Sequence, residues 1–179
     1  FSARLAHERQ RINDLVKKND LVLVMFSGVA SYPLVLAKNS LAKQIVGVEI
    51  NPQAHELAME NVRINQFGEK IKLYLGDVRE VVPKIREKFN RVVMPLPKTG
   101  EEFLDVALPR VKKNGMIHLY AFLSEEEVAD EVKKVNRICK DLKYKIKIVR
   151  QVKCGQFSPR TFRWCFDILR EPQNRRLQF

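Results

Sequence analysis

Hydrophobic positions along the chain fall into short unbroken runs, separated by segments in which they recur every three or four residues. An unbroken run of about six apolar residues is typical of a strand buried in a parallel sheet, and the recurring spacing is typical of an amphipathic helix. The runs predict strands at residues 21–26, 44–50, 71–75, 91–94 and 116–122. Strands that alternate with helices in this way predict an α/β domain.

Local signals mark where several of the helices begin. Asn51 can cap a helix in which Pro52 occupies the first position. Thr99 and Ser124 each precede a glutamate by three positions, which is the spacing of a capping box. We therefore expect a helix to start at each of these three points.

The last forty residues have a different pattern. Apolar and polar residues alternate over 144–148 and again over 162–168, with a turn expected at 155–159. Alternation with a period of two predicts a pair of antiparallel strands at one sheet edge. The whole chain, residues 1–179, is therefore predicted to be one domain with a mostly parallel seven-stranded sheet, helices on both faces and a C-terminal antiparallel hairpin. This arrangement resembles the class I, Rossmann-like methyltransferases.

Composition narrows the class of protein. Hydrophobic residues make up 45% of the chain and charged residues 30%, which predicts a globular domain rather than a disordered one. No apolar run approaches the roughly 20 residues of a membrane span, so we expect no membrane partner. The three cysteines and three histidines show no metal-ligand spacing, so we expect no metal. A sparse, odd number of cysteines favours the reducing cytoplasm. Because the chain does not start with Met, we expect it to be part of a longer protein.

The charge suggests a polyanionic partner. The net charge is +12, and from Lys140 onward there are eleven Lys or Arg residues but three acidic ones. A concentrated positive region favours binding to nucleic acid, and a solvated lysine-rich surface is the alternative.

The candidate chemistry lies where the predicted strands end, because open α/β sheets bind ligands there. The segment from Phe26 to Ala30 has one glycine, Gly28, and does not match the glycine-rich pattern that binds a pyrophosphate. Glu49 follows at the end of the next strand, where a carboxylate can accept two hydrogen bonds from a ribose diol. This combination favours an adenosine cofactor without a phosphate. The alternatives are a tight turn at Gly28 and a solvated loop residue at Glu49.

Two further strand ends carry candidates. Asp77 can accept the exocyclic amine of adenine, or it can cap the helix that follows it. Pro95 and Pro97 fix a rigid, extended backbone whose carbonyls can point at a base edge, or they form a stiff loop that only ends the strand.

Five segments together resemble one family. They are Phe-Ser-Ala-Arg-Leu-Ala-His-Glu-Arg at 1–9, Met-Phe-Ser-Gly-Val at 25–29, Glu-Ile-Asn-Pro at 49–52, Gly-Asp-Val-Arg-Glu at 76–80 and Met-Pro-Leu-Pro-Lys at 94–98. They are similar to motifs of the archaeal and eukaryotic tRNA guanine-37 N1-methyltransferases, whose close relatives are the aminocarboxypropyl transferases of wybutosine synthesis.

The resemblance implies that S-adenosyl-L-methionine is the cofactor. The positions that match its binding residues are Arg4, Phe26, Glu49 and Asp77, and the adjoining Gly28, Ile50 and Val78 complete the expected cofactor site. Glu8 matches the glutamate proposed as general base. Pro95 and Pro97 match the loop that receives the target guanine.

The implied function is methyl transfer to N1 of guanine 37, next to the tRNA anticodon. The implied partner is the anticodon stem-loop, with phosphates held by basic residues at 143–153, and we expect a monomer. The chain departs from many family members at Val24, Ala30 and Pro95. Two alternatives therefore remain, namely aminocarboxypropyl transfer to a wyosine precursor and a non-catalytic RNA-binding domain.

Overall fold

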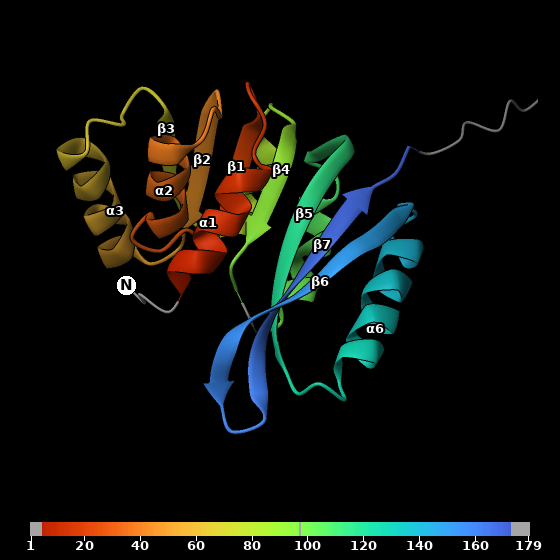
Figure 1. Cartoon of the computed structure of the whole chain (residues 1–179). Helices are drawn as coiled ribbons and strands as arrows, with labels where there is room; N and C mark the ends of the chain where they lie inside the picture. The colour runs from red at the N-terminus through yellow and green to blue at the C-terminus, as the bar shows by residue number, and fades with distance from the viewer. Residues whose placement is uncertain (1–4, 97, 173–179) are drawn as a thin grey trace, which may run out of the picture.

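The structure, a computed structural model, describes residues 5–96 and 98–172. In these residues the strands form one seven-stranded sheet in the order β3-β2-β1-β4-β5-β7-β6 (Figure 1). The strands are β1 (Leu21–Met25), β2 (Gln44–Glu49), β3 (Ile71–Leu75), β4 (Phe89–Met94), β5 (Val111–Leu123), β6 (Ile146–Ser158) and β7 (Thr161–Arg170). The predicted fold class is confirmed.

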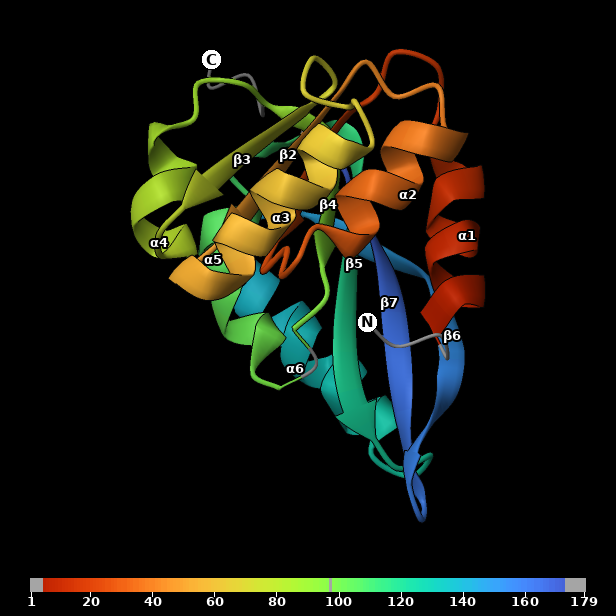
Figure 2. The same cartoon turned by 90° about the vertical axis from the view of Figure 1, so that its left-hand side faces the viewer.

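The helices lie in two layers, one on each face of the sheet (Figure 2). They are α1 (Ala6–Leu15), α2 (Ser31–Asn39), α3 (Pro52–Ile64), α4 (Val78–Val81), α5 (Leu104–Ala107) and α6 (Val128–Asp141), with short 3₁₀ turns η2 (Val82–Lys84) and η3 (Gly100–Phe103). No helix in the described part of the chain is both long enough and apolar enough to cross a bilayer.

Successive residues of the central strands supply the two halves of the core. Leu23 packs with the side of α4, α5 and α6, whereas Val24 packs with the side of α1, α2 and α3, and both are fully buried. This is why β1 is apolar at every position, since a sheet covered on both faces has no solvent side.

The strand order reverses between β1 and β4. The chain runs from β1 outward to β2 and β3, then returns to place β4 on the other side of β1, and all of these pairs are parallel. Loops therefore diverge at the carboxyl ends of β1 and β4, which is where open α/β sheets bind ligands.

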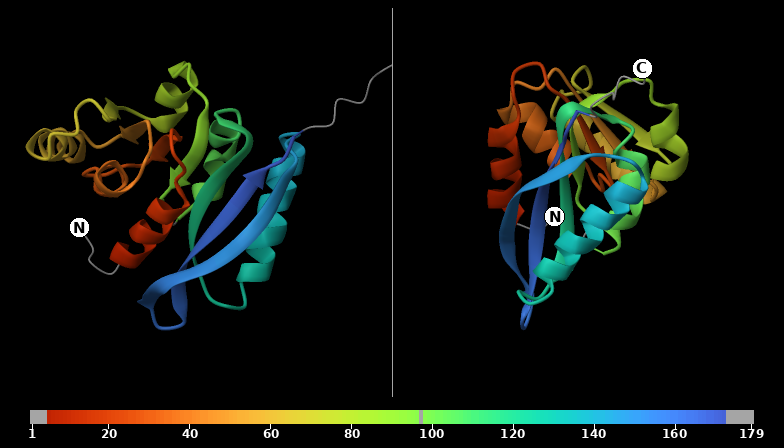
Figure 3. Two further views of the ribbon diagram at one scale, coloured as in Figure 1. Left: turned by 45° about the horizontal axis from the view of Figure 1, so that its top comes forward. Right: turned by 90° about the vertical axis from the view of Figure 1, so that its right-hand side faces the viewer.

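The C-terminal hairpin extends beyond the carboxyl ends of the parallel strands (Figure 1). Strand β7 pairs antiparallel with β5 and β6, and α6 packs against this part of the sheet (Figure 3). The turn joins Ser158 to Thr161, so the expectation of a turn at 155–159 is wrong. Gly155 instead lies within β6, beside a register shift and with a φ of 138°.

The helix-start signals were only partly correct. The Asn51 cap is confirmed, because its Oδ1 accepts hydrogen bonds from the amides of Gln53 and Ala54. The capping box at Thr99 is wrong: its φ is 54°, and its side chain makes no cap hydrogen bond to η3. At Ser124 half of the box forms, since the Glu127 carboxylate accepts the Ser124 amide at 2.7 Å.

Candidate functional site

The Glu49 carboxylate joins the loops after β1 and β2. Its Oε2 accepts the amide of Gly28 at 2.7 Å, and its Oε1 accepts the amide of Asn51 at 2.8 Å. Gly28 has a φ of 55°, and no atom lies within 4 Å of the position that a Cβ would take. The loop is therefore open beside a carboxylate whose position is fixed by two backbone donors.

The loop after β3 is tied to the same place. The Gly76 amide donates to the Glu49 carbonyl at 2.9 Å. The next residue, Asp77, caps α4 by accepting the Arg79 amide at 2.8 Å, so the cap interpretation is confirmed. A cofactor contact by Asp77 stays a prediction.

Apolar side chains flank the two acids. Ile50 follows Glu49 directly, and 61% of it is exposed, although it is a large aliphatic residue. Phe26 has a φ of 60°, and its ring lies edge-on to Phe103 with the centroids 4.9 Å apart. Val78 is the first residue of α4, and its side chain is buried in the core. The strand ends thus offer fixed carboxylates beside an uncovered aliphatic surface.

Three predicted site residues remain, and the structure describes one of them. Pro95 follows β4 and is half-buried. Arg4 and Pro97 lie outside the described residues, so their predicted roles have no structural account.

Glu8 lies in a buried polar network between α1 and the sheet. It is 4% exposed. Arg11 donates to both carboxylate oxygens at 2.8 Å, and the Tyr120 hydroxyl on β5 donates to Oε1 at 2.6 Å. The Tyr32 hydroxyl on α2 in turn donates to that of Tyr120 at 3.0 Å. The predicted general base is therefore held in one orientation by groups from α1 and β5.

The network continues away from Glu8 through β7 and β5. Arg11 also donates to Asp167, which lies 2.6 Å from Nδ1 of His118. Arg91 Nη1 lies 2.8 Å from the other ring nitrogen, Nε2. Because an arginine can only donate, Nε2 accepts, and His118 carries its proton on Nδ1 and donates it to Asp167.

Two groups in this network have pKa values that are shifted from their usual ranges. Burial lowers the pKa of His118, so the ring is neutral at pH 7. Burial alone would raise the pKa of Asp167, but hydrogen bonds from His118 and Arg11 bring it well below its usual range. The described His118, Cys165 and Asp167 side chains lie within 4.8 Å of one another. We assign them to this hydrogen-bonded network, because Arg11 and Arg91 already pair with it.

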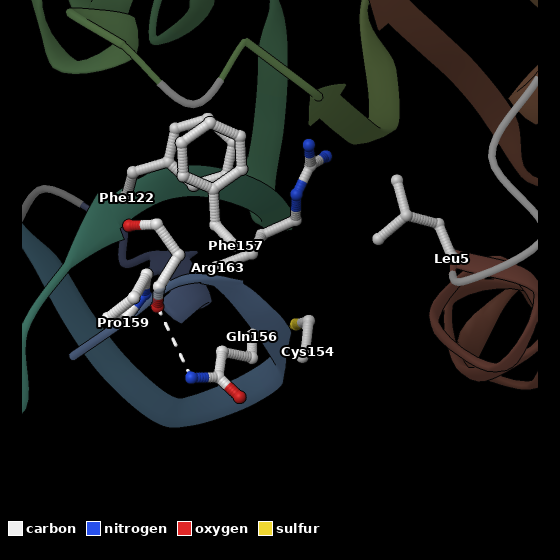
Figure 4. A pocket seen from close by; sticks show the side chains of 9 residues that line it. Leu5, Phe122, Cys154, Gln156, Phe157, Pro159 and Arg163 are labelled. Carbon is white, nitrogen blue, oxygen red and sulfur yellow. Dashed lines mark hydrogen bonds between the residues drawn. The ribbon is translucent and has the colours of Figure 1, made fainter. Parts of the chain in front are cut away.

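A hollow of about 920 Å³ opens at the hairpin end of the sheet (Figure 4). The rings of Phe122 and Phe157 stack there with centroids 3.9 Å apart, and the Arg163 guanidinium lies 5.0 Å from the Phe122 ring. Cys154 forms part of the wall, opposite Leu5 of the segment that precedes α1. Burial and the nearby Glu8 charge raise the pKa of the Cys154 thiol. Cys154, which lines the hollow, is therefore near enough to Glu8 for the carboxylate to affect its thiol.

Sequence reasoning did not find Tyr120, His118, Asp167 or the aromatic pair. A signal existed for two of them, since His118 and Asp167 are polar residues inside apolar strand runs. Phe157 was not predicted as a site residue because its segment was expected to be a turn.

One known protein family matches most of this chain. The family described as the TRM5/TYW2 methyltransferase domain matches residues 1–147. The chain belongs to this family. The matched residues include the loops at the carboxyl ends of β1, β2 and β3, and they end at the start of β6.

Two relatives show the range of the TRM5/TYW2 family. The tRNA (guanine(37)-N(1))-methyltransferase Trm5b of Methanocaldococcus jannaschii is 45% identical over 120 residues, 67% of this chain and 34% of the relative. The tRNA(Phe) (4-demethylwyosine(37)-C(7)) aminocarboxypropyltransferase of the same organism is 30% identical over 119 residues, 66% of this chain and 47% of the relative.

Two solved structures have the same fold. M. jannaschii Trm5 in complex with adenosine has a TM-score of 0.82 and 33% identity, over 97% of this chain and 51% of that one. The complex of aTrm5 and tRNALeu has a TM-score of 0.80 and 33% identity, over 96% and 47%. This chain therefore spans about half or less of each of these four relatives.

Proposed function

We propose that this chain transfers a methyl group from S-adenosyl-L-methionine to N1 of guanine 37 in tRNA. The observation that carries the proposal is the fixed Glu49 carboxylate at the open Gly28 loop, in a member of the TRM5/TYW2 family. The sulfonium group of the bound cofactor supplies an electrophilic methyl group.

The residues at the strand ends fit the adenosine part of this cofactor. Each Glu49 oxygen has a second lone pair beyond the one that accepts a backbone amide, which suits the two hydroxyls of a ribose. The exposed side chain of Ile50 gives the adenine ring an apolar surface. Asp77 follows on the neighbouring strand, where its carboxylate can accept the exocyclic amine. We place Phe26 and Val78 in the same site, the first beside the open loop and the second at the start of α4.

Glu8 is proposed to take the N1 proton of the target guanine. Guanine N1 becomes a good nucleophile once that proton is removed, and a carboxylate within hydrogen-bond reach can remove it as the methyl group arrives. Arg11 and Tyr120 hold the carboxylate in place, so positioning contributes to the rate. The hollow beside Cys154 gives the base its approach to Glu8.

The tRNA is proposed to lie along the hairpin. To reach Glu8 the target base has to leave its stack, and the Phe122 and Phe157 rings offer an unstacked base an aromatic surface. Basic residues at 143–153 lie on β6 and in the segment just before it, and they suit the phosphates of the anticodon stem. Pro95, at the end of β4, is proposed to shape the entrance for the base. The three free cysteines suit a reducing cytoplasm, where we propose that the chain acts as a monomer.

The direct test is to incubate the protein with unmodified tRNA and isotopically labelled cofactor, and to identify the modified nucleosides by mass spectrometry. We expect labelled 1-methylguanosine at position 37. A second reaction uses tRNA that carries 4-demethylwyosine at position 37, and a gain of the aminocarboxypropyl group there, without methylation of guanine 37 in the first reaction, would overturn the proposal in favour of the activity named for the second relative. A tRNA in which guanine 37 is replaced by adenine is the matched control.

A non-catalytic RNA-binding domain is tested separately by calorimetry with S-adenosyl-L-methionine. We expect saturable binding. No heat at millimolar cofactor, together with intact tRNA binding, would favour the non-catalytic alternative.

A further inference from the structure

A second hollow, of about 400 Å³, lies at the opposite end of the parallel strands, where β4 and β5 begin. Its walls come from the loop between α1 and β1, the starts of β4 and β5, and the facing parts of β6 and β7. The hollow lies where the parallel strands begin, whereas Glu49 lies where β2 ends, so the two sites are separate. The proposed function gives a role to only one of its basic side chains, Arg150, which belongs to the proposed tRNA surface at 143–153.

The walls carry five basic side chains, and four of them have no carboxylate partner. The four are Lys17, Lys112, Lys113 and Arg150, none of which has a carboxylate oxygen within 4.0 Å among residues 5–96 and 98–172. The fifth is Arg91. The resulting positive charge faces a concave surface, where the protein walls strengthen its effect on an anion.

The two acids of the hollow already have partners, Asp20 within the hollow itself and Asp167 in the network around Glu8. Asp20 accepts the Lys17 amide at 2.9 Å and lies 3.9 Å from Arg91 Nε. Asp167 pairs with Arg11 and His118. Neither acid therefore neutralises the lysine ammonium groups at the mouth.

Arg91 gives the hollow a fixed cationic wall. Its side chain is 8% exposed, with one Nη bonded to His118 and the other to the Leu15 carbonyl. Its Nε is buried and has no hydrogen-bond partner in the described structure. A rigid guanidinium between flexible lysines is an arrangement that suits a tetrahedral oxyanion.

Lysines elsewhere in the described residues are of two kinds. Lys133, Lys134, Lys145 and Lys153 each pair with a carboxylate, whereas exposed residues such as Lys72 and Lys84 do not. The feature that distinguishes the hollow is therefore not the lack of a partner alone, but the convergence of five basic side chains on one concave surface.

We propose that this hollow binds a phosphate group. The group belongs either to a small phosphorylated molecule or to the backbone of the RNA substrate. Both present the same oxyanion to the same cations.

The first experiment uses inorganic phosphate as the probe. We expect it to shift the ¹H–¹⁵N amide resonances of residues 112–115 saturably in the native chain, at constant ionic strength. Lys17→Gln/Lys113→Gln changes two exposed side chains on different walls and is expected to weaken this binding at least tenfold. Lys72→Gln/Lys84→Gln, with the same charge change at exposed positions on β3 and η2, is the control and should leave it unchanged. Unsaturable shifts, or equal weakening in both variants, would overturn the site.

The second experiment identifies the source of the phosphate. If the RNA backbone occupies the hollow, Lys17→Gln/Lys113→Gln should weaken tRNA binding and reduce the slope of log K against log salt by about 1, as for one lost phosphate contact. If a small molecule occupies it, that variant should bind tRNA as the control does. Each result supports the site once the first experiment is positive. Absence of methyl transfer would overturn the proposed function and leave the phosphate titration unaffected.

Discussion

The Glu49 side chain connects the backbones of two loops while facing the proposed ribose. We expect Glu49→Ala to lower S-adenosyl-L-methionine affinity at least tenfold, because the Gly28 and Asn51 amides lose their acceptor and the ribose loses its own. Isothermal calorimetry measures this. Glu56→Ala, an exposed glutamate on α3, is the control and should bind normally. Unchanged affinity in Glu49→Ala would remove this residue from the site.

Glu8 should behave differently, because its proposed task is proton transfer. Glu8→Gln keeps the size of the side chain and one acceptor oxygen for Arg11 and Tyr120. We expect cofactor affinity within about twofold of the native value and single-turnover methylation slowed by about 10²-fold or more, the usual scale of acid–base catalysis. If binding and turnover fell together, Glu8 would be a structural residue only.

At the scale of elements, the Arg11–Asp167 ion pair fastens α1 to β7. Removing one member of a buried pair leaves the other charge without compensation. We expect Asp167→Asn to lower the free energy of unfolding by about 3 kcal/mol. Urea denaturation measures the change. Asp105→Asn breaks an exposed pair with Arg79 and should cost less than about 1 kcal/mol. Equal losses in the two variants would contradict the buried role.

The sequence predicted those elements whose signals are local. Continuous apolar runs located the parallel strands within a few residues, and the Asn51–Pro52 signal located the start of α3. The hairpin turn was misplaced because Gly155 marks an irregularity inside β6, where the chain does not reverse. Thr99 was misassigned because its left-handed backbone conformation depends on the surrounding fold.

The candidate site could be predicted only in part for the same reason. Glu49 ends β2 and Asp77 follows the end of β3, so their position follows from the strand pattern. The contact of Glu8 with Tyr120 could not be predicted, because the two residues are 112 positions apart in the sequence. No local periodicity encodes such a contact.

At the scale of the whole molecule, the network predicts sensitivity to acid. The folded state lowers the pKa of His118, so below about pH 6.5 the unfolded chain binds the extra proton and stability falls as pH falls. We expect the free energy of unfolding to drop by about 1 to 2 kcal/mol between pH 6.5 and pH 5. The lowered pKa of Asp167 has the same sign but acts below about pH 4.

His118→Gln tests this assignment. The variant should be less stable than the native protein at pH 7, because Arg91 and Asp167 lose part of their hydrogen bonding. Its stability should nevertheless change less between pH 6.5 and pH 5, as measured by urea denaturation across that range. A pH dependence as steep as that of the native protein would assign the effect to other groups.

Strand β6 is the last strand in the sheet order. A long edge strand has unpaired backbone N–H and C=O groups with which a strand of a second molecule can form hydrogen bonds. Its lysines and register shifts oppose such pairing, because two copies brought edge to edge would repel one another. The residues proposed to meet RNA phosphates therefore also keep neighbouring copies apart. Neutralising them to weaken RNA binding would carry a second effect, an increased tendency to aggregate.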